Sequence, residues 1–201
     1  LSSSNDFLYA SIHNVVRTLI EAIILVVLVV FVFLRNFRST VIPLVGIIVS
    51  IIGTFMFLYF LGFSINLLTL FALVLSIGVV VDDAIIVVEA VHSRFDAGYE
   101  SPYKATVDAM EGITSAVITS SLVFMAVFLP VSMIGGTSGA FYTQFGLTMA
   151  VAVGISAINA LTLSPALCSI LLKPHDEAGR EVKMSWGKRL SMALDASFGR
   201  I

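Results

Sequence analysis

The sequence has little charge and almost no cysteine. Charged residues make up 12% of the 201 residues and hydrophobic residues 58%, whereas a soluble domain carries roughly 25% charged residues. This composition excludes an ordinary water-soluble globule, and the apolar content is too high for a disordered chain. The single cysteine, Cys168, can form no internal disulfide. With a net charge of −2 there is no basic excess to neutralise phosphates, so no nucleic-acid partner is expected.

Two long stretches contain no Asp, Glu, Lys, Arg or His, namely 41–81 and 113–172. Each is long enough for two membrane-spanning helices of about 20 residues. A further apolar run covers 22–34 and is extended by apolar residues from Val15 onward. None of these runs shows the alternation typical of barrel strands. The fold class predicted is therefore an all-α membrane protein with five transmembrane helices, at about 15–34, 41–61, 65–90, 113–134 and 145–172.

Basic residues predict the orientation of these helices, because Lys and Arg are concentrated in cytoplasmic loops. The loops at 61–66 and 135–144 contain no basic residue, and the N-terminal segment contains only Arg17. The other two loops and the tail hold the rest: Arg35, Arg38, Arg94, Lys104, Lys173, Arg180, Lys183, Lys188, Arg189 and Arg200. We therefore expect residues 1–14 to be a periplasmic lead-in and the C-terminus to be cytoplasmic.

Several local signals refine this layout. Ser101 and Pro102 are typical of an N-cap and a first-turn proline, which predicts a surface helix leading into the fourth span. Asn66 is expected to cap the third helix, and Pro165 to kink the fifth. In the tail, 173–201, a polar linker precedes apolar residues at four-residue steps, which predicts a cytoplasmic amphipathic helix at the lipid interface or against another domain: Trp186, Leu190, Leu194 and Phe198.

The most informative residues are Asp82 and Asp83, which lie inside the third apolar helix. An ionisable residue near the centre of a membrane helix costs about 2.5–3.5 kcal/mol on insertion scales. Both the low-dielectric surroundings and the neighbouring carboxylate disfavour the charged form. We therefore expect the pair to act as a coupled proton site, with protons as the coupling ion and no other cofactor. Two alternatives are a pair that reaches water at the helix end and a static buried salt bridge.

Other polar residues are weaker candidates. Glu89 lies two turns after Asp82 on nearly the same helix face, so it could release protons, although such a residue more often marks the membrane boundary. Hydroxyls on the fourth span, among them Ser120, could line a water path or bond back to their own helix. His13, His92 and His175 lie in separate segments without ligand spacing, so no metal site is expected.

Four stretches of the chain resemble the resistance-nodulation-division (RND) efflux pumps. They are Gly78–Glu89 (GVVVDDAIIVVE), Ser11–Ile23, Gly135–Phe145 (GGTSGAFYTQF) and Leu163–Cys168. The resemblance covers essentially the whole chain in the family's order. In the heavy-metal branch the position of Asp83 is typically Ala, so the double Asp favours the hydrophobe/amphiphile (AcrB-like multidrug) branch. The departures, Ser164, Ala90 and His92, lie outside the acidic pair.

The resemblance implies a fragment of a proton-driven drug antiporter with twelve membrane helices. This chain would supply the second to the sixth helix. It implies that Asp82 and Asp83 form the proton relay in the bacterial inner membrane and that a Lys on a second-half helix is their partner. It further implies a homotrimer, a periplasmic adaptor, an outer-membrane channel, and hydrophobic or amphiphilic drugs bound outside this segment. Taken alone, the chain is expected to transport nothing.

Three rival functions stay open at this stage. The first is a metal-efflux or protein-export relative within the same family. The second is an intramembrane aspartyl protease, which needs two carboxyls on facing helices, whereas Asp82 and Asp83 are sequential on one helix. The third is a membrane scaffold that transports nothing.

Overall fold

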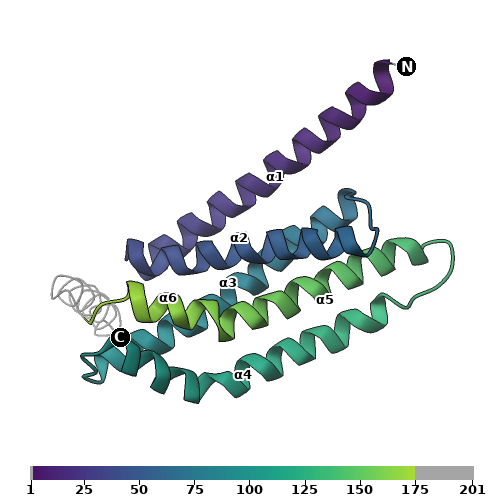
Figure 1. Cartoon of the computed structure of the whole chain (residues 1–201). Helices are drawn as coiled ribbons and strands as arrows, with labels where there is room; N and C mark the ends of the chain where they lie inside the picture. Colours follow the sequence, from purple (N-terminus) through teal and green to yellow (C-terminus); the bar gives the residue numbers. More distant parts are fainter. Residues whose placement is uncertain (1, 175–201) are drawn as a thin grey trace, which may run out of the picture.

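A computed structural model describes residues 2–174, which form six helices joined by short connections (Figure 1). The helices are α1 (Ser2–Leu34), α2 (Phe37–Phe60), α3 (Leu67–Asp96), α4 (Pro102–Val131), α5 (Gly139–Leu161) and α6 (Leu163–Leu171). Five stretches are long and apolar enough to cross a membrane, with α5 and α6 together forming the fifth. The prediction of an all-α membrane protein with five spans is confirmed. The predicted tail helix lies outside the described residues.

The helix ends follow local signals in the sequence. The Asn66 side chain accepts hydrogen bonds from the backbone N–H groups of Leu68 and Thr69, and the Thr69 hydroxyl oxygen accepts one from the Asn66 N–H. This reciprocal capping box satisfies N–H groups that have no partner within the helix. Ser101 caps α4, with Pro102 in the first turn, as expected. Gly62, at φ 70°, ends α2 in a left-handed conformation that favours glycine.

Three helix bounds differ from the apolar runs. α1 begins at Ser2, well before the apolar stretch, because no Pro or Gly interrupts residues 2–14. α4 is continuous from Pro102, so the expected surface helix and the fourth span are one helix. The fifth span breaks at Thr162. Pro165 has no N–H to bond to the carbonyl of the fourth residue before it, so the break has a local cause.

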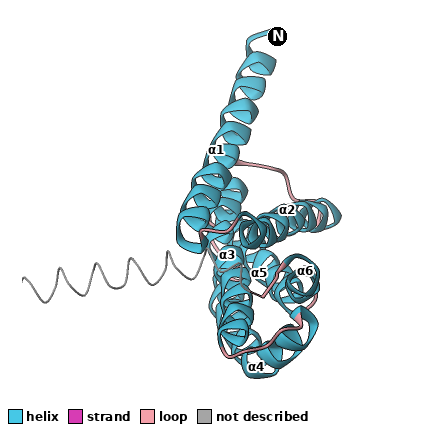
Figure 2. Ribbon diagram, turned by 90° about the vertical axis from the view of Figure 1, so that its left-hand side faces the viewer, coloured by secondary structure: helices cyan, strands magenta, loops and turns pink. Residues whose placement is uncertain are grey.

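α5 lies at the centre of the bundle and packs against α2, α3, α4 and α6 (Figures 1 and 2). Its contact with α4 is close at Gly146, where a Cβ atom would stand 2.7 Å from the Phe128 carbonyl oxygen and 2.8 Å from the Ser132 nitrogen. Small residues allow this approach between membrane helices. α1 packs only against α2 and α3 among the described helices, and its N-terminal part projects from the bundle.

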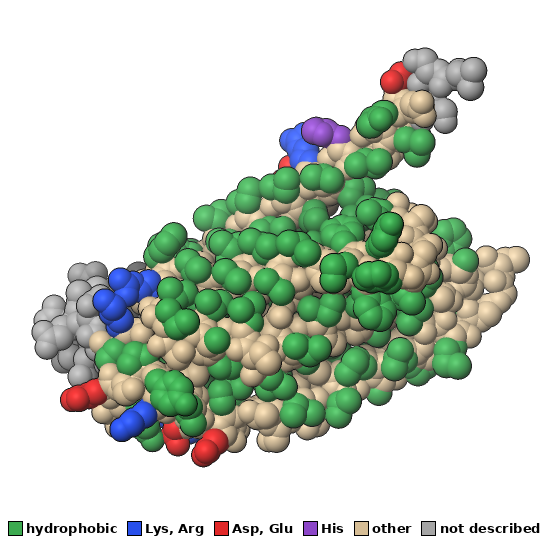
Figure 3. Space-filling model, in the orientation of Figure 1, with side chains coloured by type: hydrophobic (Ala, Val, Ile, Leu, Met, Phe, Trp, Pro, Cys, Tyr) green, Lys and Arg blue, Asp and Glu red, His purple; other side chains and the backbone are tan. Residues whose placement is uncertain are grey.

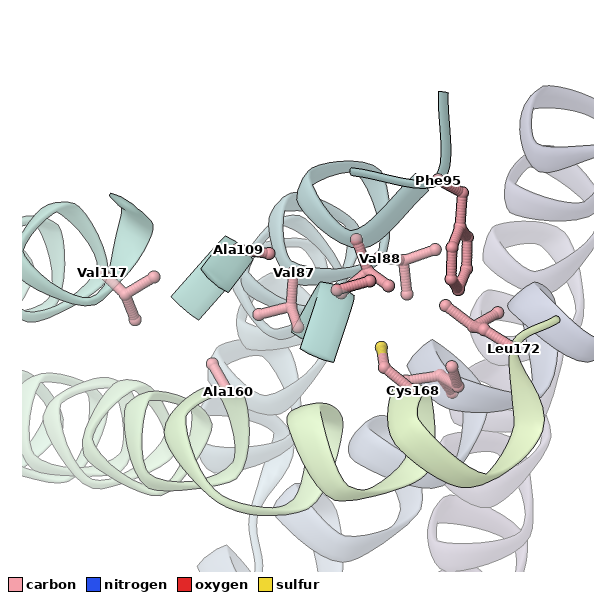
Figure 4. Packing of buried hydrophobic residues seen from close by; sticks show 11 residues of the cluster. Val87, Val88, Phe95, Ala109, Val117, Ala160, Cys168 and Leu172 are labelled. Carbon is pink, nitrogen blue, oxygen red and sulfur yellow. The ribbon is translucent and has the colours of Figure 1, made fainter. Parts of the chain in front are cut away.

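Two buried clusters hold the helices together. One joins the end of α3 to the beginning of α4 and to α6, with Val87, Val88, Phe95, Cys168 and Leu172 among its members (Figure 4). The other joins α1, α2 and α3 through Val30, Ile47, Ile77, Val80 and Val81. On the face that Figure 3 shows, the sides of the bundle are largely apolar, and charged side chains gather at one end and on the projecting part of α1. This distribution fits a bundle surrounded by lipid or by further helices.

Candidate functional site

Asp82 and Asp83 lie near the middle of α3, with apolar turns on both sides. Because neighbouring residues of a helix point about 100° apart, the two carboxylates face different surroundings. Asp83 is buried, with 6% of its surface exposed, whereas Asp82 lies on an exposed face of the helix. The acidic pair therefore combines one group held inside the bundle with one group open to a partner.

Asp83 points toward α5. The hydroxyl of Ser156 on α5 donates a hydrogen bond to the Asp83 carboxylate, with 2.5 Å between Oγ and Oδ2. Ser156 is itself buried, with 1% of its surface exposed. A hydroxyl that donates to a carboxylate stabilises its charged form. The arrangement therefore ties the charge state of α3 to the position of α5.

Asp82 belongs to one continuous exposed face of α3. The face consists of residues at steps of three or four: Leu67, Phe71, Leu75, Gly78, Asp82, Ile86 and Glu89. Within residues 2–174 the Asp82 carboxylate makes no hydrogen bond and no ion pair. An unpaired carboxylate at this depth is too costly to face lipid. Among the described residues this face of α3 is uncovered, and Asp82 on it is open to solvent or to a further partner.

The two weaker candidates are not joined to the acidic pair by any hydrogen bond or ion pair among the described residues. Glu89 shares the exposed face of α3 with Asp82. Ser120 is exposed, and its hydroxyl donates to the Val117 carbonyl oxygen of its own helix at 3.0 Å. The hydroxyl that does reach the pair is Ser156 on the fifth span.

Sequence reasoning missed Ser156 and a neighbouring polar residue, Asn159. Asn159 is buried, and its Nδ2 donates to Oγ of Ser50 on α2 at 2.9 Å. A signal for both residues was present. Asn159 is the only amide side chain between residues 145 and 172, and Ser156 lies three residues before it, which puts both on neighbouring positions of one helix surface.

The family model and the individual relatives that match this chain agree on one family. The family model described as "AcrB/AcrD/AcrF family" matches residues 2–201. The multidrug export protein AcrF of Escherichia coli (strain K12) is 47% identical over 180 residues, which is 90% of this chain. The toluene efflux pump membrane transporter TtgB of Pseudomonas putida is 48% identical over 164 residues, or 82% of the chain.

A third relative, the multidrug resistance protein MdtC of Pantoea ananatis, is 42% identical over 191 residues, or 95% of the chain. The chain spans only a small part of these relatives, namely 17% of AcrF, 16% of TtgB and 18% of MdtC. The family model thus covers the whole bundle, whereas the likeness reaches only a small share of each longer relative.

Proposed function

The chain belongs to the AcrB/AcrD/AcrF family, and we propose that it forms part of the proton-translocating membrane domain of a proton-driven multidrug efflux transporter. One observation supports this most strongly. A carboxylate without a partner among the described residues, Asp82, lies in the middle of a membrane helix beside a second, buried carboxylate. Charged groups at this depth are rare and typically mark proton relays or ion pathways.

Asp82 requires either a proton or a cation from outside this segment. Its exposed face on α3 is suited to packing against further helices, since most of its residues are apolar. We propose that a Lys on a helix of the second half pairs with the acidic pair when it is charged. Protonation of Asp82 or Asp83 then releases the Lys, and the helices shift between two packings.

The energy available to such a switch is sufficient. One charge that crosses 100 mV is worth about 2.3 kcal/mol, and each unit of a pH gradient adds about 1.4 kcal/mol. Since a tenfold population change needs about 1.4 kcal/mol, 100 mV alone biases the two packings by roughly 40-fold, and a further pH unit raises this to roughly 400-fold. Proton uptake is thus able to drive the conformational change without any other cofactor.

The proposed setting is the bacterial inner membrane, with a periplasmic N-terminus and a cytoplasmic C-terminus. Arg38 lies in the first turn of α2, Arg94 in the last turn of α3 and Lys104 in the first turn of α4. Figure 3 shows Lys and Arg side chains gathered at one end of the bundle, which supports a cytoplasmic end there. The family resemblance supports a homotrimer that joins a periplasmic adaptor and an outer-membrane channel. Drugs would bind in parts of the transporter outside this segment.

Hydrophobic or amphiphilic compounds are the proposed substrate class. The names of the relatives refer to multidrug and toluene export, which supports this class over metal ions or exported proteins. Geometry argues against an intramembrane aspartyl protease, because the two carboxyls lie on one helix and point to different sides. The second, fourth and fifth spans contain no acidic residue within 41–61, 113–134 and 145–172, and Glu21 of α1 is paired with Arg17.

The test is substitution in the full-length transporter, expressed in cells that lack their own efflux pumps. Asp82→Asn and Asp83→Asn should each abolish drug export while the protein still reaches the membrane in normal amounts. Glu111→Gln removes an exposed carboxylate from α4 and serves as the control, with export unchanged. Normal export by either Asn variant would overturn the proposal. A loss with Glu89→Gln would add Glu89 to the proton path.

A further inference from the structure

A second buried hydrogen bond lies one turn from the acidic site. The Asn159 amide on α5 donates to the Ser50 hydroxyl on α2 at 2.9 Å. Both side chains are buried, with exposed fractions of 8% for Asn159 and 1% for Ser50. Most of the other buried hydroxyls among the described residues bond instead to the backbone of their own helix, as Thr148 and Thr54 do.

A side chain of α5 also packs closely against the backbone of α2 at this level. Gly53 lies on α2 three residues after Ser50, and a Cβ atom there would stand 3.1 Å from Cδ1 of Ile155 on α5. Ile155 directly precedes Ser156. The contact between α2 and α5 therefore includes a hydrogen bond and a tight apolar contact. Both lie next to Ser156, the residue that bonds to Asp83.

One turn of α5 is consequently bonded on two sides. Ser156 bonds to α3 through Asp83, and Asn159 bonds to α2 through Ser50. Residues three apart are neighbours on a helix surface, so the rotation of α5 that suits one bond largely determines the geometry of the other. A small rotation of α5 would withdraw the Ser156 hydroxyl from the carboxylate.

We propose that the Asn159–Ser50 hydrogen bond is a positioning contact for the acidic site: it fixes the rotation of α5 on α2 and so holds the Ser156 hydroxyl against Asp83. The proposal rests on the proposed proton-coupling function. It makes α2 and α5 a single unit whose position sets how readily Asp83 takes up a proton. A polar pair that only fills space would have no such effect.

The test is the pH profile of proton-driven drug exchange by the full-length transporter in proteoliposomes. Asn159→Leu and Ser50→Ala should move the profile in the same direction as Ser156→Ala, by roughly half to one pH unit, since one unit corresponds to a tenfold change in proton affinity. In a Ser156→Ala background, Asn159→Leu should cause no further shift, because its effect acts through Ser156. Thr148→Val, which removes a buried hydroxyl bonded within α5, should leave the profile unchanged.

If the pH profile of drug exchange is unchanged in both single variants, Ser50→Ala and Asn159→Leu, the proposal is overturned, even if their thermal stability falls. Independent, additive shifts from Asn159→Leu and Ser156→Ala would overturn it as well. The infrared absorption band that disappears in Asp83→Asn belongs to the Asp83 carboxyl group. The position of this band supplies a second measurement, which does not depend on transport. If Asp83→Asn still exports drugs, the proposed function fails, whereas a band unmoved by Asn159→Leu contradicts the positioning role.

Discussion

Ser156 and Asp83 meet across the α3–α5 contact, with the serine hydroxyl 2.5 Å from a carboxylate oxygen that is almost wholly buried. The bond joins the helix that contains the acidic pair to the helix at the centre of the bundle. Hydrogen bonds to charged groups contribute about 1.5–3 kcal/mol. A change in the charge of Asp83 therefore alters the contact between α3 and the central helix α5.

We predict that Ser156→Ala impairs proton-driven export. The variant loses a hydrogen bond to a charged group. The rate of proton-driven drug export should therefore fall roughly tenfold, since about 1.4 kcal/mol corresponds to that factor. Drug efflux by the full-length transporter, at matched expression, measures the effect. Ser76→Ala is the control, because Ser76 is also buried but donates to the Leu73 carbonyl oxygen of its own helix. Equal effects of the two variants would contradict a special role for Ser156.

Much of the fold could be predicted because membrane helices leave a clear signal. Charge-free runs located the spans, and Asn66 and Ser101 marked two helix starts. The beginning of α1 was less predictable, and so was the continuity of α4, since Lys104 and Asp108 look like surface residues although they lie on the same helix as the fourth span. Hydropathy reports where lipid begins, whereas a helix ends only where its hydrogen-bond ladder is interrupted.

The acidic pair could also be recognised from the sequence, but its surroundings could not. Ionisable residues in an apolar run are conspicuous. The partner of Asp83 depends on how α5 is rotated and shifted against α3, and that register results from packing of the whole bundle. Ser120 and Ser156 look equally suitable in the sequence, yet only Ser156 contacts the pair.

The close contact at Gly146 predicts a packing defect. Gly146→Val puts side-chain atoms against the backbone of α4 at Phe128 and Ser132, so the helices must separate. Overpacking of this kind typically costs about 1–3 kcal/mol, and we expect a lower thermal unfolding temperature of the purified transporter. Gly46→Ala is the matched control, because a Cβ there meets nothing within 4 Å. A variant at Gly146 as stable as the control would contradict the contact.

Asn66 has two roles that different substitutions separate. Its side-chain oxygen caps α3, and its Nδ2 donates to Oε1 of Gln144 on α5. Asn66→Asp keeps the cap but loses the donor, whereas Asn66→Ala loses both. Since loss of a cap costs about 0.5–2 kcal/mol, thermal unfolding should rank wild type, Asn66→Asp and Asn66→Ala in falling order. Equal stability of Asn66→Asp and Asn66→Ala would show that the cap contributes nothing measurable.

The Arg94–Asp108 ion pair should matter little despite its good geometry. The Arg94 Nε lies 2.9 Å from Oδ2 of Asp108 and joins α3 to α4, but the side chains are 40% and 36% exposed. Pairs this exposed contribute about 0–1 kcal/mol, because water and salt screen them. We expect Asp108→Asn to leave both export and thermal stability nearly unchanged, in contrast to Asp83→Asn. A loss of export with Asp108→Asn, measured in the same cells, would show that this end of α3 is coupled to transport as well.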